Sequence, residues 1–274
     1  MFFMQKDKVT IKYKNTKLST PYFFKKGTDP NSATIIYFHG LGCQKEDFIN
    51  IAHNSQLKSF SHFAFDFPGS GRAPYPKNAY LDFYDLVEIT HKVLKKLKIK
   101  KLILVGHSSG GIVAVLYADK HPEMVEKLIN IEGTLLPEKN WYSEKIKKSG
   151  FNFDLFKSEI LPKMMEEIET AANKYPGHRK YLESLKYISL PSFFHYRVSH
   201  AKVSNELSLM KLYLGLSMST LFVSGSKHFA FRPVLKYLKK NGAKVVVISK
   251  SHHFSFHENL KEFCGQIEKF LKER

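Results

Sequence analysis

Cysteine is scarce in this chain of 274 residues, which contains only Cys43 and Cys264. Two cysteines far apart in the sequence provide no disulfide framework, and they predict a reducing compartment. Long apolar runs are also missing, since none approaches the roughly 18 residues that span a bilayer. The apolar run at residues 1–4 is too short for a signal peptide. We therefore expect a cytoplasmic protein with no transmembrane segment.

Acidic residues are too few to balance the basic ones: 25 Asp and Glu stand against 43 Lys and Arg, and the formal net charge is +18. Arginine, whose planar fork usually recognises phosphates and bases, occurs only at positions 72, 179, 197, 232 and 274. The lysines are scattered rather than gathered in one arm, which predicts a solvated basic surface. We expect no specific nucleic-acid partner, although such a surface allows weak attraction to anionic surfaces.

The stretch 102–111 carries the strongest motif of the chain. Four apolar residues at 102–105 predict a strand buried on both faces, and apolar residues recur at helical spacing after position 111. Between them lies Gly106-His107-Ser108-Ser109-Gly110, a G-x-S-x-G pattern. Strand, tight turn and helix form the context of a nucleophile elbow, which lifts Ser108 clear of the backbone. A glycine-rich turn in a nucleotide-binding sheet is the alternative for the pattern alone, but the sequence has neither G-x-G-x-x-G nor G-x-x-x-x-G-K-[ST].

The segments around this motif resemble the α/β-hydrolase superfamily, in the form of a serine esterase or lipase with a helical cap. A buried strand at 33–38 ends in His39-Gly40-Leu41-Gly42, which is similar to the family's oxyanion loop. Asp66-Phe67-Pro68-Gly69-Ser70-Gly71 is similar to its D-x-P-G-x-G, where Asp66 is expected to hold the loop. The resemblance implies an α/β fold with a mostly parallel eight-stranded sheet flanked by helices.

The remaining pattern predicts how the domain is divided. Strands are expected at 8–14, 21–25, 63–65, 128–131, 219–225 and 243–249, and helices at 44–59, 79–97 and from 260 onward. No buried strand is expected between 137 and 217, a helical and aromatic segment. The resemblance implies that residues 1–136 and 219–274 form the hydrolase core, and that 137–218 form an inserted cap over the nucleophile.

The resemblance also implies a catalytic apparatus. Ser108 is the expected nucleophile, and the backbone N–H groups of Leu41 and Ser109 are the expected oxyanion donors. The family's base follows the last strand, commonly as G-H-F, and this chain has His252-His253-Phe254 there. We therefore expect His253 to be the base, with His252 as the neighbouring alternative. His257 is expected at the surface or as a helix cap.

The third member of the triad departs from the family pattern. Most members carry an aspartate in a G-x-x-D pattern, but Gly225-Ser226-Lys227-His228 contains no acid. Some members, including haloalkane dehalogenases and pancreatic-type lipases, take the acid from the loop after the earlier strand, and Glu132 lies at that point. The alternative is that Glu132 pins the cap hinge beside a weakened dyad. His228 and the later histidines have no metal-ligand spacing, so we expect neither a metal nor a cofactor.

Together these residues imply a serine hydrolase that cleaves carboxylic esters of small to medium size through an acyl-serine intermediate. Two alternatives stay open. The same site could hydrolyse other acyl groups or a carbon–carbon bond, because cap shape decides among these reactions. The loss of the usual aspartate could instead indicate a catalytically weak, hydrolase-like protein that binds a small-molecule ligand.

Overall fold

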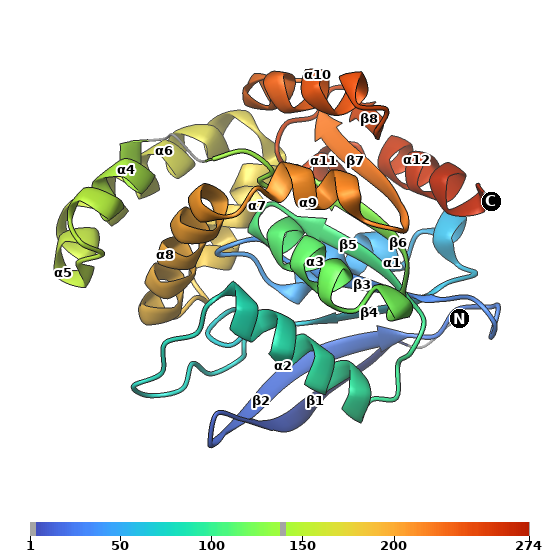
Figure 1. Cartoon of the computed structure of the whole chain (residues 1–274), viewed down its shortest axis with the longest axis horizontal. Helices are drawn as coiled ribbons and strands as arrows, with labels where there is room; N and C mark the ends of the chain where they lie inside the picture. Colours follow the sequence, from blue (N-terminus) through green and yellow to red (C-terminus); the bar gives the residue numbers. More distant parts are fainter. Residues whose placement is uncertain (1–3, 138–140, 274) are drawn as a thin grey trace.

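The computed structural model of the chain describes residues 4–137 and 141–273. Within them, one sheet runs in the order β1-β2-β4-β3-β5-β6-β7-β8 (Figure 1). Its first two strands form an antiparallel hairpin, β2 pairs antiparallel with β4, and every other pairing is parallel. The eight strands are β1 (Met4–Tyr13), β2 (Thr16–Lys25), β3 (Thr34–Phe38), β4 (Ser61–Phe65), β5 (Leu102–His107), β6 (Val125–Ile131), β7 (Ser219–Gly225) and β8 (Lys244–Ile248). The expected sheet is confirmed.

Successive side chains of a strand point to opposite faces of the sheet, and in this sheet both sets include apolar residues. Helices therefore cover both faces. On β3, Ile36 and Phe38 join one core cluster, whereas Ile35 and Tyr37 join the other. The first cluster includes side chains of α2 (Phe83–Lys96), α3 (Ser109–Lys120), α9 (Leu209–Gly215) and α10 (Arg232–Lys240). The second includes side chains of α1 (Ile49–Ala52), α11 (Ser255–Glu258) and α12 (Leu260–Lys272).

In the segment expected to form a cap, the described residues form helices joined by short turns and no strand. Its helices are α4 (Trp141–Lys148), α5 (Phe153–Leu155), α6 (Leu161–Lys174), α7 (Pro176–Leu185) and α8 (Leu190–Glu206), with a π-helical turn at Phe156–Ile160. They hold a separate aromatic cluster that includes Phe156, Phe193 and Phe194. Figure 1 shows α4, α5 and α8 to one side of the sheet. Helix α9 at the end of the segment instead packs Leu209 and Tyr213 into the main core. The boundaries of the cap at residues 137 and 218 remain a prediction.

The predicted helix over 44–59 is wrong. A 3₁₀ turn at Lys45–Phe48 leads into α1, and a second 3₁₀ turn occupies Ser55–Leu57. Asn54 separates them because its backbone is extended and its side-chain oxygen accepts a hydrogen bond from Gln56 N at 2.9 Å. That bond starts a new turn rather than continuing the helix. None of the helices in the described ranges is both long and apolar enough to cross a lipid bilayer.

Candidate active site

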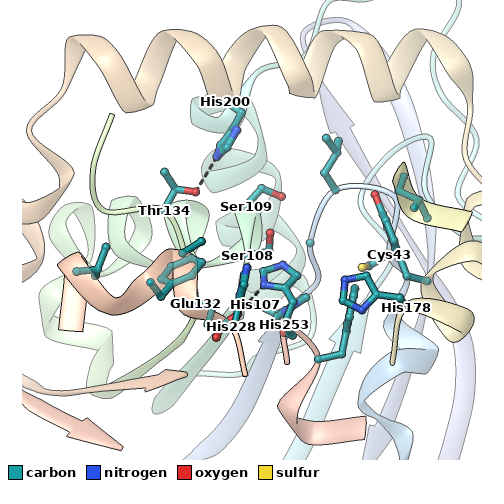
Figure 2. Close-up of a pocket in the computed structure, with 18 of the residues that line it drawn as sticks. Cys43, His107, Ser108, Ser109, Glu132, Thr134, His178, His200, His228 and His253 are labelled. Carbon is teal, nitrogen blue, oxygen red and sulfur yellow. Dashed lines mark hydrogen bonds and ion pairs between the residues drawn. The ribbon is translucent and has the colours of Figure 1, made fainter. Parts of the chain in front are cut away.

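Ser108 lies at a sharp turn between β5 and α3. Its backbone has φ 54° and ψ −125°, a strained conformation for a residue other than glycine. Gly110 permits the turn, because a Cβ at this position would lie 2.2 Å from the Phe38 carbonyl oxygen. The Ser108 N–H donates to Ile131 O at 2.9 Å, which ties the turn to the neighbouring strand. The Ser108 side chain borders a cavity of about 610 Å³ (Figure 2).

Two backbone N–H groups beside Ser108 have no hydrogen-bond partner among the described residues. Ser109 opens α3, so its N–H has no carbonyl in the preceding turn, and Leu41 lies in the loop after β3. Within residues 4–137 and 141–273, no hydrogen-bond acceptor is assigned to either N–H group. Both residues border the cavity. The pair therefore offers the donor type and location that an oxyanion at Ser108 requires.

Buried polar groups hold the loop that carries Leu41. His39 donates from Nδ1 to Gly40 O at 2.9 Å and accepts the Phe67 N–H at Nε2 at 3.0 Å, and burial lowers its pKa. Asp66 accepts the Lys45 N–H at 2.9 Å and its ammonium at 2.8 Å. These bonds join the loops after β3 and β4, which agrees with the structural role expected for Asp66.

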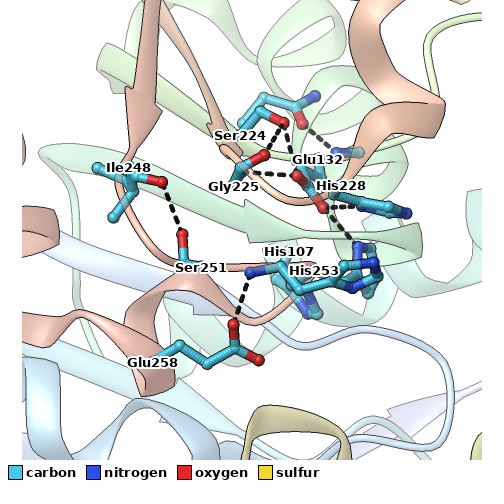
Figure 3. A network of polar contacts seen from close by, with 12 residues as sticks. His107, Glu132, Ser224, Gly225, His228, Ile248, Ser251, His253 and Glu258 are labelled. Carbon is cyan, nitrogen blue, oxygen red and sulfur yellow. Dashed lines mark hydrogen bonds and ion pairs between the residues drawn. The ribbon is translucent and has the colours of Figure 1, made fainter. Parts of the chain in front are cut away.

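Glu132 is the centre of a buried hydrogen-bond network (Figure 3). It follows β6 with φ 48° and is 1% exposed. Its Oε1 accepts from Ser224 Oγ at 2.6 Å and from Gly225 N at 2.8 Å. Its Oε2 lies 2.6 Å from Nδ1 of His228 and 2.6 Å from Nδ1 of His253. The loops after β6, β7 and β8 thus meet at one carboxylate.

The network determines the ionisation of Glu132. Burial by itself would raise the pKa of this carboxyl, but the hydrogen bonds and charges of His228 and His253 lower it below its ordinary value. Glu132 is therefore an anion at neutral pH. A buried carboxylate beside one imidazole nitrogen fixes the ring and favours a positive charge on it.

The sequence assigned no part to His107, although its ring supports the His253 loop. Its Nε2 donates to His253 O at 3.0 Å, and the two ring centroids are 4.7 Å apart. Burial is the largest cause that lowers the pKa of His107 well below the ordinary value, and the nearby His253 adds to it. His107 is the first of the two variable residues of the G-x-S-x-G pattern, and nothing in that pattern indicates this contact.

The other two histidines of the loop have different neighbours. His252 stacks on Tyr175 at 4.2 Å between centroids, and burial is the main cause that lowers its pKa to about 4. It makes no hydrogen bond to Glu132 in the described part of the chain, whereas His253 does. The expectation that His257 lies at the surface or caps a helix is wrong, because it lies inside α11 and Asn259 is the N-cap of α12. Its side chain is 4% exposed, with Nε2 3.6 Å from Asp47 Oδ1, because α11 turns it inward.

Glu132, His228 and His253 also form the one group among the described residues whose ligand atoms could approach a metal, all lying within 4.8 Å of one another. The separations of 2.6 Å fit direct hydrogen bonds. Two ligand atoms at about 2.0–2.2 Å from a tetrahedral zinc ion would be roughly 3.3 Å apart. The geometry therefore favours a proton-sharing network over a metal centre.

The cavity has a polar floor and mainly apolar walls. His200 Nε2 lies 2.9 Å from Thr134 Oγ1 on one wall, and Arg197 donates to Ser143 Oγ at 2.9 Å nearby. The apolar part of the lining includes Leu135, Leu136, Tyr142, Met164, Ile168, Tyr181, Phe231 and Val234. Side chains from core loops and from the helical segment 141–206 thus enclose Ser108 together.

Comparisons with known proteins agree with this architecture. A family model described as alpha/beta hydrolase fold matches residues 33–260. "Putative esterase/lipase 2" of Mycoplasma genitalium is 25% identical over 272 residues, covering 94% of this chain and 95% of that protein. Its namesake in Mycoplasma pneumoniae is 33% identical over 94 residues, only 34% of this chain and 35% of that protein.

Solved structures are similar over almost the whole chain. A carboxylesterase of the Thaumarchaeon Nitrososphaera gargenis has a TM-score of 0.77 at 19% identity, covering 96% of this chain and 97% of that one. A thermophilic esterase from Thermogutta terrifontis has a TM-score of 0.78 at 17% identity, covering 98% of both chains. At such identities the similarity establishes the fold alone.

Proposed function

The chain belongs to the alpha/beta hydrolase fold family, and we propose that it is a serine hydrolase that cleaves carboxylic esters of small to medium size. The observation that carries this proposal is the bond between the Glu132 carboxylate and Nδ1 of His253, at 2.6 Å, beside a serine on a strained elbow. A serine at its free pKa is a poor nucleophile, and an imidazole oriented by a carboxylate is the standard means of activating it.

In the first half-reaction, Ser108 Oγ attacks the ester carbonyl carbon while His253 Nε2 takes the hydroxyl proton. The carbonyl oxygen becomes an oxyanion that the N–H groups of Leu41 and Ser109 stabilise. Each such donor is worth about 3–4 kcal/mol in known cases. Collapse of the tetrahedral intermediate breaks the bond to the alcohol oxygen, and His253 returns its proton to that oxygen. The acyl group then remains on Ser108.

In the second half-reaction, water attacks the acyl carbon and gives a proton to His253. The second tetrahedral intermediate releases the carboxylic acid, and Ser108 Oγ recovers the proton. Throughout both steps Glu132 stabilises the transient imidazolium. His228 acts as a positioning residue, because its hydrogen bond to Oε2 fixes the carboxylate.

The cavity supports the proposed substrate size. Its volume of about 610 Å³ falls within the range of roughly 300–1,000 Å³ for small-molecule sites. Its apolar walls suit an acyl or alkyl chain, and its polar floor surrounds the reacting atoms. The name of the Mycoplasma genitalium relative, a putative esterase/lipase, is consistent with this substrate class.

A labelling and turnover experiment tests the proposal. Wild type should react with a fluorophosphonate probe and hydrolyse a short-chain p-nitrophenyl ester, whereas Ser108→Ala should lose labelling and about 10³-fold or more of the turnover. Ser226→Ala, which changes an exposed serine in the loop after β7, is the matched control and should behave as wild type.

Two results would contradict the proposal. Full activity in Ser108→Ala would mean that another group is the nucleophile. A wild-type protein that neither labels nor turns over any ester would favour the alternative of a hydrolase-like ligand-binding protein.

A further inference from the structure

Acidic residues are missing from one long stretch of the chain. Residues 207–257 contain no Asp or Glu, whereas they contain eight basic residues: Lys211, Lys227, Arg232, Lys236, Lys239, Lys240, Lys244 and Lys250. The 25 carboxylates of the chain therefore all lie outside this stretch, which includes α9, β7, α10, β8 and most of α11. The positive charge of residues 207–257 is therefore not balanced by any acidic residue within the same stretch.

Much of this charge is on one surface, which we call the α10 face: the exposed residues Lys227, Phe229, Arg232, Lys236, Tyr237, Lys239 and Lys240. Helix α10 lies at the outer edge of the molecule, above β8 in Figure 1. In the described ranges, no carboxylate lies within 4.0 Å of a basic group on this face. By contrast, Lys244 on β8 pairs with Glu273 at 2.6 Å.

The α10 face also exposes aromatic side chains. Phe229 is 59% exposed and Tyr237 is 46% exposed, two of the six large hydrophobic residues most exposed in the described chain. The Arg232 guanidinium lies over the Phe229 ring at 4.2 Å from its centroid. Exposed aromatic rings among flexible lysines form the side-chain combination that suits the boundary between lipid headgroups and acyl chains.

The α10 face borders the active-site cavity. Ala230 and Pro233 are exposed and also border the cavity, and Phe231 and Val234 line its wall from the inner side of the same segment. One short stretch of chain therefore separates the basic aromatic surface from the space around Ser108. An ester in a surface bound to this face would lie near the cavity.

We propose that the α10 face docks on an anionic phospholipid bilayer and presents the cavity to esters held in that bilayer. Lysine ammonium groups attract acidic headgroups, and Phe229 and Tyr237 enter the headgroup layer. RNA would complement the charge as well, and its bases would stack on the rings, but it would give no role to the adjoining cavity, whose apolar walls suit an acyl or alkyl chain. The docking rests on the charge and the rings; only the bilayer origin of the substrate rests on the proposed function.

Vesicle binding tests the docking without turnover. The full chain with Ser108→Ala should bind vesicles of phosphatidylcholine containing about one third phosphatidylglycerol, and bind pure phosphatidylcholine vesicles at least about tenfold more weakly. Changing Lys236, Lys239 and Lys240 to Glu should weaken binding to the anionic vesicles by at least about tenfold, because three attractive charges become repulsive. Phe229→Ser should weaken binding severalfold even at low salt.

Matched controls separate this surface from the general charge. Changing Lys6, Lys8 and Lys12 to Glu makes the same charge change on the exposed part of β1, at the opposite edge of the sheet. Tyr84→Ser removes an aromatic ring that is 53% exposed on α2. Both controls should change vesicle binding by less than about twofold. Equal losses in the α10 and β1 variants would overturn the proposal.

Two further measurements distinguish the remaining outcomes. The α10 variant is the one with Lys236, Lys239 and Lys240 changed to Glu. If these changes weakened binding to a single-stranded RNA but not to vesicles, the partner of the α10 face would be a nucleic acid, and the proposal would be overturned. Hydrolysis of a soluble short-chain ester, measured with Ser108 intact, should be the same in the α10 variant and in wild type. If the chain bound vesicles but had no esterase activity, the proposed function would be wrong and the docking surface would still be supported.

Discussion

At the scale of single residues, the main feature is the place of Glu132, the carboxylate that we propose as the triad acid. Glu132 follows β6, and the position after β7 where the family usually has its acid is occupied by His228. The Glu132 carboxylate reaches His253, because the loops after β6, β7 and β8 converge at the same edge of the sheet. His228 donates to the same carboxylate, with its Nδ1 2.6 Å from Glu132 Oε2.

This arrangement predicts unequal effects for two substitutions around one carboxylate. Glu132→Gln should lower kcat/KM by about 10²–10⁴-fold, because an amide cannot stabilise the imidazolium and favours the wrong tautomer. His228→Ala should lower it by about tenfold or less, because the bond from Glu132 to His253 persists. Ester hydrolysis over a range of pH measures both effects.

The pH profile separates positioning from folding. Without the His228 hydrogen bond, the negative charge on Oε2 of Glu132 is less neutralised and stabilises the protonated base more strongly. The acid limb of the kcat/KM profile should therefore move to higher pH. His228→Asn retains a donor and should restore the wild-type limb. A loss in His228→Ala as large as that in Glu132→Gln, and not restored in His228→Asn, would show that His228 does more than position the carboxylate.

Ser108, His253 and Glu132 could be predicted from the sequence because each follows a predicted strand, and their catalytic roles stay predictions. The roles of His107 and His228 could not be predicted in the same way. Each depends on a contact between residues more than 90 positions apart in the chain, namely 146 for His107 with His253 and 96 for His228 with Glu132. No local pattern encodes such a distance.

At the scale of elements, the elbow depends on how closely β3, β5 and α3 approach one another. A methyl group at Gly110 would lie 2.2 Å from Phe38 O and 2.6 Å from His39 O, both backbone atoms that cannot rotate away. Gly110→Ala should therefore lower the free energy of unfolding by about 3 kcal/mol and reduce activity. Chemical denaturation with tryptophan fluorescence measures the change.

Gly215→Ala is the matched control for this substitution. Gly215 ends α9, and a methyl group there would meet no atom within 4 Å. Its replacement should change stability by less than about 1 kcal/mol, and the sign should favour alanine. If both substitutions had the same small effect, close packing at the elbow would not explain the glycine.

The strands could be predicted because each central one is a short apolar run that ends at a turn. The error at 44–59 has a physical cause. Phe48, Ile51 and Ala52 are all buried, and their spacing at i, i+3 and i+4 is that of one helical face. The side chain of Asn54 ends that regularity locally, because it accepts a hydrogen bond from Gln56 N and starts a new turn.

At the scale of the whole molecule, stability should depend on buried neutral histidines. The pKa of His62 is lowered to about 3, that of His178 to about 3 and that of His252 to about 4, with burial as the largest cause. An unfolded histidine titrates near about 6.5, so between that pH and about 4 the unfolded chain binds more protons than the folded one. The stabilising contribution is complete above pH 6.5 and is lost as the pH falls toward the folded values.

Thermal unfolding at constant ionic strength should show this dependence. The Tm should be nearly constant from about pH 8 to 7 and fall steadily between about pH 6.5 and 4, where repulsion among the excess positive charges adds to the loss. His62 is fully buried, accepts the Tyr37 hydroxyl at Nδ1 at 2.8 Å and donates to Leu57 O at 3.1 Å. Its protonation would remove the acceptor, so His62 should contribute strongly to the slope.

His62→Gln isolates that contribution. Glutamine offers one donor and one acceptor but does not titrate, so the variant should be less stable than wild type at pH 7 and the difference should shrink as the pH falls to about 4. His53→Gln, at an exposed position before the same turn, should leave the pH dependence unchanged. A difference between His62→Gln and wild type that stays constant over this range would mean that His62 does not couple folding to protons. The acid sensitivity would then arise from the other histidines and from the overall charge.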